Sequence, residues 1–195
     1  MKINKLQKNS GFTLVEALVA ILILSISVSA MLGVTANTAT SARYANNQIA
    51  ANYLLQEAID SVRNSRDTMA FQMLGSGGSW NAFLSRYGAP NSKCFSSSGC
   101  LLNLEVFNGA DPSGINDVIG CNGECNPLYY DTNATKLFYN YRSTGEVVSN
   151  FTRKVTMVAT PGNSDEVKVT ATVNWKNGST PKTQSLEVYL LNWQK

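Results

Sequence analysis

The sequence contains no histidine, and only 15% of its 195 residues are Asp, Glu, Lys or Arg. Without an imidazole the chain cannot form a Ser-His-Asp or Cys-His relay, or a zinc or haem site that uses histidine. A redox Cys-x-x-Cys pair is missing, and no Gly-Lys-Ser or Gly-Lys-Thr follows the glycine-rich stretch 74–79, so a nucleotide-binding phosphate loop is not indicated. We therefore expect a protein that is not an enzyme and that uses no cofactor and no metal ion.

Charge is unevenly placed along the chain. The excess of 16 basic over 13 acidic residues comes from Lys2, Lys5 and Lys8, which lie in the first eleven residues without an acid among them. The remainder is neutral, so it has no overall attraction for nucleic acid, and any DNA contact would need a local patch. Hydrophobic residues make up 44% of the chain, which predicts one folded domain with one extended element.

One long apolar run stands near the N-terminus, from Phe12 to Val34, and Glu16 is its only charged residue. As a helix these 23 residues span about 35 Å, which is enough to cross a hydrocarbon layer of about 30 Å. The lysines all precede the run, so the positive-inside bias leaves the N-terminus in the cytoplasm. We expect a single-pass precursor in the cytoplasmic membrane, with everything after Val34 outside.

Two processing schemes fit this run. A secretory signal would be cut after Ala30, following the small residues that such a site needs, and would release a soluble protein. A cut between Gly11 and Phe12 would instead keep the helix on the mature chain. Glu16 favours the second scheme, because a carboxylate within a membrane helix costs about 2.5 to 3.5 kcal/mol and a disposable signal gains nothing from it. The new amine on Phe12 would meet this carboxylate, either within one helix or between two staggered helices.

The segment Lys8-Asn9-Ser10-Gly11-Phe12-Thr13-Leu14-Val15-Glu16 resembles the prepilin leader junction of type IV pilins and type II secretion pseudopilins. The resemblance implies that prepilin peptidase, a membrane protease, cuts after Gly11 and methylates the amine of Phe12. It also implies that Glu16 sets the register of assembly between subunits. The implied partners are the peptidase, other pilin or pseudopilin subunits, the membrane and the inner-membrane assembly machinery.

Beyond the apolar run the sequence predicts that the helix continues without proline to about residue 74. Apolar residues at Ala51, Leu55, Ala58, Ile59 and Val62 follow helical spacing, with polar residues between them, so this half should be amphipathic. Gly33 is its weak point, costing about 1 kcal/mol against alanine. It indicates either local loosening of the helix or close packing against another helix.

The C-terminal part predicts three consecutive antiparallel strands. Apolar and polar residues alternate from 167 to 176, and the flanking segments 151–160 and 183–191 would pair with that strand through turns at 161–164 and 177–181. The end of the chain, 173–176 and 186–193, is similar to minor pilins of the PilV type and to the minor pseudopilin I family.

The expected fold is α+β, with a long N-terminal helix packed on a C-terminal antiparallel β-sheet as in pilins. The expected divisions are a basic prepilin leader 1–11, a transmembrane and assembly helix 12–34, an amphipathic helix 35–74, a loop-rich disulfide-containing connector 75–150 with short apolar runs at 101–107 and 136–141, and an antiparallel β-sheet 151–195.

The four cysteines all follow the apolar run, in the compartment where disulfides persist. Proximity favours pairing Cys94 with Cys100 and Cys121 with Cys125, while an interleaved pairing is the rival and a cysteine-only zinc site is disfavoured. Nearby oxygen ligands lack the EF-hand spacing, so they are interpreted as solvated turn residues rather than a calcium site. They are Asp111, Asn116, Asp117, Glu124 and Asp131. A separate cluster of aromatic rings could face either water or the core, and it comprises Tyr129, Tyr130, Phe138, Tyr139 and Tyr141.

These patterns together predict a minor type IV pilin-like structural subunit. It would be processed by prepilin peptidase and assembled into a pilus or pseudopilus filament in the periplasm or outside the cell. The alternatives are a type II secretion or competence pseudopilin, and a filament-tip subunit that binds a surface or takes up DNA. A secreted enzyme released after Ala30 is disfavoured by the missing histidine and nucleophile motif.

Overall fold

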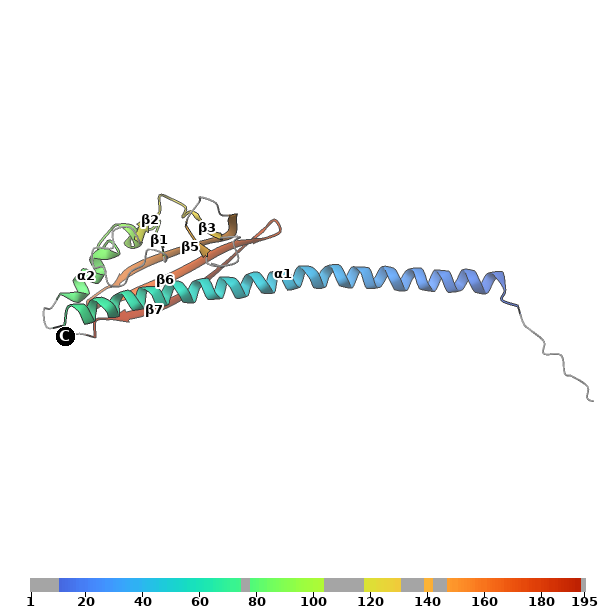
Figure 1. Ribbon diagram of the computed structural model, residues 1–195, viewed down its shortest axis with the longest axis horizontal. Coiled ribbons are helices and arrows are strands. Elements are labelled where there is room, and N and C mark those ends of the chain that lie inside the picture. The colour runs from blue at the N-terminus through green and yellow to red at the C-terminus, as the bar shows by residue number, and fades with distance from the viewer. Residues whose placement is uncertain (1–10, 75–77, 104–117, 131–138, 142–146, 194–195) are drawn as a thin grey trace, which may run out of the picture. The chain divides into compact units, whose positions relative to one another are not determined.

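The computed structural model describes residues 11–74, 78–103, 118–130, 139–141 and 147–193. The chain divides into two compact units, Met1–Ala45 and Asn46–Lys195, and we call the second unit the head. The boundary falls inside helix α1 (Leu14–Gln72), which begins in the first unit and ends in the head. Each unit is described here by itself, and Figure 1 gives the labels of the elements.

The predicted continuation of the N-terminal helix is confirmed, because α1 is a single element of 59 residues with no proline in it. Within the head, the face of α1 predicted from helical spacing is buried. Its five predicted apolar residues, Ala51, Leu55, Ala58, Ile59 and Val62, are each no more than 2% exposed. Hydrophobic burial therefore fixes which side of this part of α1 faces the sheet.

The predicted three-strand antiparallel sheet is also confirmed. Strand β6 (Asn163–Asn177) lies between β5 (Val147–Thr160) and β7 (Thr180–Leu191), with Phe151 opposite Trp175 and Ala171 opposite Leu186. The other edge of β5 pairs with two short strands, which extend the sheet further. These are β1 (Cys100–Leu102), which continues to β2 (Val118–Gly120), and β3 (Pro127–Tyr130), which continues to β4 (Tyr139–Asn140).

The connections between the long strands are tighter than the sequence suggested. Only Pro161 and Gly162 separate β5 from β6, and only Gly178 and Ser179 separate β6 from β7. Both glycines have positive φ, +79° and +62°, which two-residue turns of these kinds require. The strands therefore extend into segments that the composition had marked as turns, and Pro181 is accepted because β7 pairs on one side with β6.

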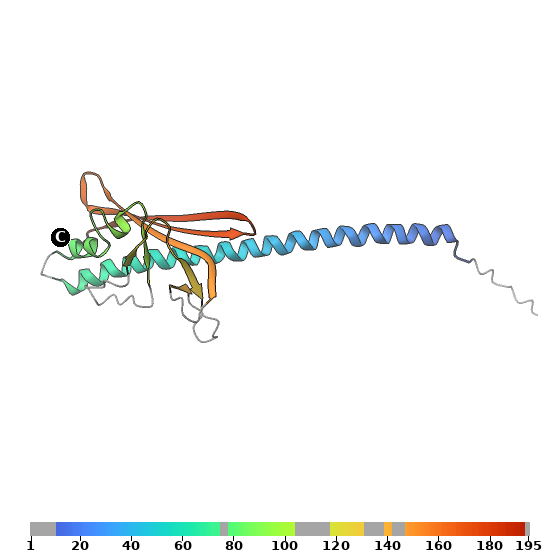
Figure 2. The same ribbon diagram turned by 90° about the horizontal axis from the view of Figure 1, so that it is seen from above.

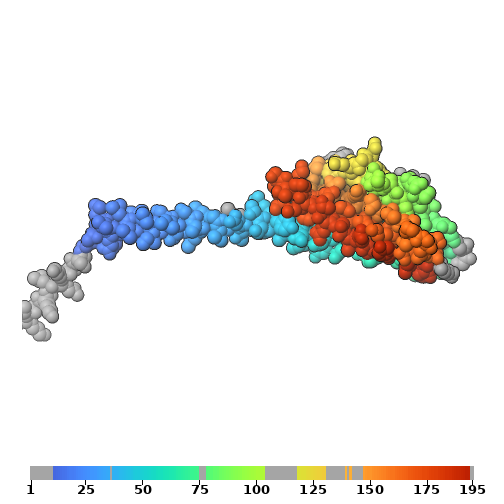
Figure 3. All heavy atoms as spheres, turned by 180° about the vertical axis from the view of Figure 1, so that it is seen from behind, coloured from blue at the N-terminus to red at the C-terminus, as the bar shows by residue number. Residues whose placement is uncertain are grey.

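One face of this sheet packs on α1 and the other faces outward. The inward side chains of β5 and β6 are buried, including Val155, Met157, Val169 and Val173. Polar contacts fasten β7 beside α1, since Gln184 Nε2 donates to Asn52 Oδ1 at 2.6 Å. The outward faces of β5 to β7 form one side of the head (Figure 3, orange and red). The head is thus an α+β layer pair, as predicted from the sequence.

The segment before the sheet contains a short helix that the sequence analysis did not anticipate. Helix α2 (Ser79–Arg86) places Trp80 and Phe83 in the core, with ring centroids 5.4 Å apart, and Phe83 lies 5.1 Å from Tyr87. The indole of Trp80 donates to the carbonyl oxygen of Ser164 at 2.8 Å, which ties α2 to the start of β6. A short 3-10 helix, η1 (Lys93–Phe95), follows α2, and Figure 2 shows both on the same side of the head.

Candidate functional site

The expected processing junction lies at the start of α1. Gly11 and Phe12 precede the helix, and Phe12 is 72% exposed. A Cβ atom added at Gly11 would meet nothing within 4 Å, and Gly11 does not have a positive φ. The folded chain therefore does not itself require glycine at this position, so the reason for a glycine must be sought in a molecule that acts on the chain.

Glu16 lies in the first turn of α1 and is exposed. Its backbone N–H donates to Thr13 Oγ1 at 3.3 Å, which satisfies one of the free amides at the helix start. Thr13 and Glu16 have the S/T-x-x-E spacing of a capping box, and a negative side chain is favoured there by the helix dipole. The hydrogen bond uses the backbone of Glu16 and the side chain of Thr13, so the carboxylate itself contributes to the helix start only through the helix dipole.

The apolar run is uncovered within its own unit. Its large hydrophobic side chains range from 49% exposed at Val28 to 77% exposed at Leu14. Among the described residues, α1 is the one helix that is long enough and apolar enough to cross a membrane. None of its most apolar stretch is buried. Such a surface needs lipid or other helices around it, because water would solvate it at a large cost.

The hydroxyl groups on this part of α1 bond to the helix itself. Each donates to a carbonyl oxygen one turn earlier, so none needs water as its acceptor. This internal bonding reduces the cost of placing the segment in a hydrocarbon environment. The bonds run from Ser25 to Ile21 at 2.7 Å, Ser27 to Ile23 at 2.9 Å, Ser29 to Ser25 at 2.8 Å, Thr35 to Met31 at 2.9 Å and Thr38 to Val34 at 2.8 Å.

Gly33 lies inside α1, and the helix continues through it. A Cβ atom there would meet nothing within 4 Å. The isolated chain thus gives no packing reason for glycine at this position. Both earlier interpretations, local loosening and close approach of another helix, stay open and depend on the assembled state.

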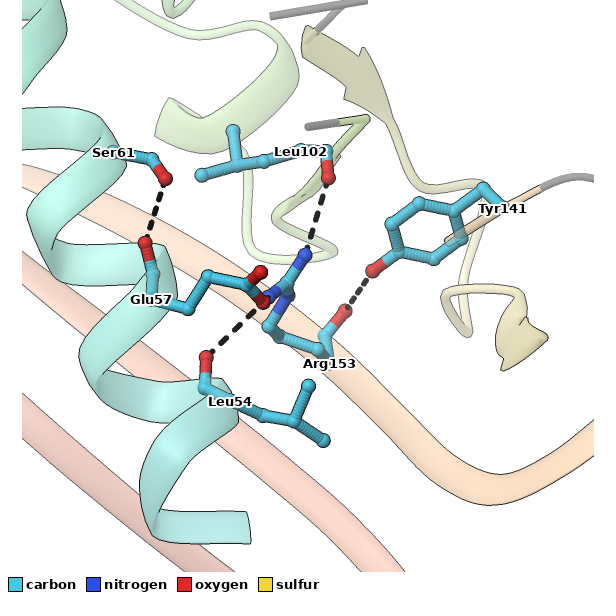
Figure 4. Close-up of polar contacts among 6 residues, drawn as sticks. All are labelled: Leu54, Glu57, Ser61, Leu102, Tyr141 and Arg153. Carbon is cyan, nitrogen blue, oxygen red and sulfur yellow. Dashed lines mark hydrogen bonds and ion pairs between the residues drawn. The ribbon is translucent and has the colours of Figure 1, made fainter. Parts of the chain in front are cut away.

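In the head, a buried arginine joins the sheet to α1, a feature that the sequence analysis missed (Figure 4). The side chain of Arg153 is 1% exposed and forms an ion pair with Glu57. Its Nη1 also donates to Leu54 O at 3.4 Å, and its Nη2 donates to Leu102 O at 3.2 Å. One guanidinium thus connects β5, α1 and β1. The signal that could have revealed it is the inward position of Arg153 between Phe151 and Val155 in the strand alternation.

Tyr141 completes this polar cluster. Its hydroxyl donates to Arg153 O at 3.3 Å, and the two residues lie together in Figure 4. Burial raises the pKa of Tyr141 above the usual 10.0, and this effect outweighs Arg153, which acts to lower that pKa. The phenol is therefore a neutral donor over the whole physiological range.

The cysteines form two short disulfide loops, Cys94–Cys100 and Cys121–Cys125, with Cα separations of 4.6 and 4.9 Å. This is the pairing that sequence proximity favoured. The loops lie against each other, since the N–H of Cys121 donates to Gly99 O at 2.9 Å. They brace the connection between η1, β1 and β3.

Several predicted residues lie outside the described part of the chain. They are the leader residues Lys2, Lys5 and Lys8, the oxygen-bearing residues Asp111, Asn116, Asp117 and Asp131, and the ring Phe138. Glu124 is described, and it is exposed beside the second disulfide. Within the described ranges, no three His, Cys, Asp or Glu residues are placed to hold a metal ion.

Comparison with known proteins identifies the N-terminal segment. Residues 6–32 match the family model of the prokaryotic N-terminal methylation motif. No curated protein and no solved structure matches the chain. The matched segment contains Gly11, Phe12 and Glu16, together with most of the apolar run.

This match supports a type IV pilin-like prepilin signal and a pilin-like or pseudopilin-like subunit. A signal of this type implies processing by a prepilin peptidase and assembly with other pilin subunits. The apolar helix that follows is consistent with a membrane-anchored precursor. The α+β head, with a long N-terminal helix on an antiparallel sheet, has the layout expected of a pilin.

Proposed function

We propose that this protein is a minor structural subunit of a type IV pilus-like filament and that it is not an enzyme. The observation that carries the proposal is the matched methylation motif, which leads directly into an uncovered apolar helix with one charged residue. A peptidase would cut between Gly11 and Phe12 and methylate Phe12. The mature chain would then leave the membrane by packing its helix among those of neighbouring subunits.

Glu16 would set the axial register of that packing. Cleavage creates a cationic amine on Phe12 in an apolar setting, and Glu16 supplies the only opposite charge between Phe12 and Val34. An unpaired charge in such a setting is costly, so a subunit whose amine meets a carboxylate is favoured over one out of register. The capping contact to Thr13 leaves the carboxylate at the helix surface, where a neighbour can approach it.

The minor role rests on the head. Residues 173–176 of β6 and the segment 186–193, which continues past β7 to Trp193, resemble minor pilins of the PilV type and the minor pseudopilin I family. A subunit of a type II secretion or competence pseudopilus is the second candidate, because the same stem would serve either filament. A filament-tip binding role is favoured by exposed aromatic rings, since Phe71 and Trp193 form an edge-to-face pair and are 64% and 52% exposed.

The mature N-terminus, measured by mass spectrometry on protein from the native host, tests the proposal. We expect a chain that begins with N-methylated Phe12. A chain that begins at Met31 would contradict the proposal and support a secreted soluble protein. The Gly11→Val variant is the matched control, because the fold has room for the side chain while the peptidase site is lost.

The Glu16→Ala variant tests the assembly step separately. We expect normal cleavage and a loss of most incorporation into sheared filaments, measured by immunoblot against the membrane pool. Glu16→Gln removes the charge and keeps the size of the side chain, and both variants keep the backbone N–H that donates to Thr13 Oγ1. Wild-type incorporation of both variants would show that the carboxylate does not set register.

A further inference from the structure

Asparagine followed by glycine occurs three times in the chain, at 108–109, 122–123 and 177–178. This dipeptide can lose its side-chain nitrogen without an enzyme, because glycine leaves the following backbone nitrogen unhindered. The pair at 108–109 lies outside the described residues, and the fold holds the other two pairs in different surroundings. The two described pairs therefore share one chemistry and differ in how the fold constrains it.

Asn122 lies in a loop between β2 and β3 that the Cys121–Cys125 disulfide closes. Asn122 and Gly123 are both exposed. The chain reverses at Gly123, whose φ is +84°, and a Cβ atom there would meet nothing within 4 Å. The strand-like pairing of Asn122 is an isolated bridge to Glu124, two residues away, and not a place in a ladder. The side-chain amide and the backbone nitrogen that follows it are thus open to water.

Asn177, in contrast, is the last residue of β6 and is held by the sheet. Its backbone pairs with Thr180 of β7 across the two-residue turn. The preceding residue, Lys176, is fastened from the other side, because its N–H donates to Asn150 Oδ1 at 3.2 Å. Ring closure requires the asparagine backbone to rotate until the next nitrogen reaches the side-chain carbonyl carbon. At Asn177 this rotation must wait for the end of the hairpin to open.

We propose that Asn122 is a site of spontaneous covalent modification, at which the side-chain amide becomes aspartate or isoaspartate. The backbone nitrogen of Gly123 bonds to Cγ of Asn122 and gives its proton to solvent, and the side-chain nitrogen leaves as ammonia. Water then opens the cyclic imide. Breakage of the bond between nitrogen and Cγ gives aspartate, and breakage of the bond between nitrogen and the backbone carbonyl carbon of residue 122 gives isoaspartate. The net reaction consumes one water and releases one ammonia.

The modification changes both charge and backbone in this loop. It adds a carboxylate two residues from Glu124 and lowers the formal net charge of the chain from +3 to +2. The isoaspartate product also inserts one CH₂ group into the backbone of the ring closed by Cys121 and Cys125. That ring is bonded to the first disulfide loop, through the N–H of Cys121 and the carbonyl oxygen of Gly99 at 2.9 Å. An ageing head therefore acquires a second form of this loop, whatever the protein assembles with.

Timed incubation of the full chain in detergent and mildly alkaline buffer tests the proposal. Samples are digested in mildly acidic buffer, which prevents new conversion, and fragment mass spectra assign each asparagine. We expect Asn122 to convert about tenfold faster than Asn177, because the strand end must open before Asn177 can react. Electron-transfer fragmentation distinguishes the two products, and both should be found at residue 122. Equal rates at the two positions in the folded chain would overturn the proposal.

Unfolding supplies a matched control within the same molecule. In concentrated guanidinium chloride with the disulfides reduced, both pairs lose their folded surroundings, so their rates should agree within about twofold. A tenfold difference that persists there would show that neighbouring residues, and not the fold, set the order of reaction. That result would also overturn the proposal.

The Asn122→Gln variant checks the assignment of the reacting residue. Glutamine keeps an amide at this exposed position but would have to close a larger ring, which forms more slowly. We expect the acidic product at residue 122 to disappear while the rate at Asn177 stays unchanged. An acidic product that still accumulates in the same peptide at the wild-type rate would show that another residue reacts, and the assignment to Asn122 would be wrong.

Discussion

Arg153 on β5 and Glu57 on α1 form an ion pair in which the arginine is buried and the carboxylate is half-buried at the edge of the core. Because the guanidinium also donates to Leu54 O and Leu102 O, three elements converge on a single side chain. This pair joins the C-terminal sheet to the N-terminal helix across almost one hundred residues of sequence. It gives the head a polar link in addition to its hydrophobic one.

Removing Glu57 should destabilise the head. We expect Glu57→Ala to lower the free energy of unfolding by about 1 to 3 kcal/mol, because Arg153 then remains buried without its counter-ion. The value falls below that of a fully buried pair, since Glu57 is 40% exposed. Urea unfolding of the full chain in detergent, followed by tryptophan fluorescence, gives the measurement.

The double variant Glu57→Ala with Arg153→Met serves as its control. It removes the orphaned charge, so we expect it to recover part of the loss. A double variant less stable than Glu57→Ala alone would show that the other bonds of Arg153, to the carbonyls of Leu54 and Leu102, dominate.

Stability should fall in alkali partly through Tyr141. Its pKa is raised in the folded protein by burial, so the unfolded chain loses this proton first as the pH rises. The stabilising contribution is complete below about pH 10, the ordinary pKa of tyrosine, and it is lost as the pH rises through the folded value. We expect the Tyr141→Phe variant to show a shallower loss of unfolding free energy above pH 10 than the wild type.

The two disulfides should contribute unequally. By restricting the entropy of the unfolded chain, each of these short disulfide loops should stabilise the folded head by about 2 kcal/mol. The Cys94–Cys100 pair is wholly buried, so the double alanine variant there also loses packing and should be the less stable of the two. The matched double variant at Cys121 and Cys125 is the comparison, and equal urea midpoints would contradict the expected order.

Gly33→Ala should strengthen α1 locally. The position has space for a methyl group and a helical backbone, so we expect a gain of about 1 kcal/mol and amide exchange about fivefold slower around residue 33 in lipid nanodiscs. Ala30→Gly is the reverse control and should speed exchange by a similar factor. Unchanged exchange in Gly33→Ala would show that the helix there is already limited by something other than glycine.

Sequence patterns predicted the elements in which one physical effect dominates. Helical spacing identified the buried face of α1 from Ala51 to Val62, and strict alternation identified β6, since burial on one face governs both. Helix α2 was not predicted, because eight residues beside glycines carry little periodic signal. Its place in the fold depends on tertiary contacts of Trp80 and Phe83.

The methylation motif at residues 6–32 was also predictable from sequence, because it is a short contiguous segment. The Arg153 cluster was not predictable in this way. Arg153 shares the inward face of β5 with Phe151 and Val155, but its partners on α1 and β1 could not be identified from that alternation alone.

The internally bonded hydroxyls of α1 have a consequence for how the subunit changes surroundings. Because Ser25, Ser27 and Ser29 already donate to their own helix, exchanging lipid contacts for protein contacts breaks none of these bonds. Under the proposed function, extraction of α1 from the bilayer would need no rehydration of these hydroxyl groups. The apolar segment would then pass directly from fatty-acyl chains to neighbouring protein. A free copy in aqueous solution would aggregate.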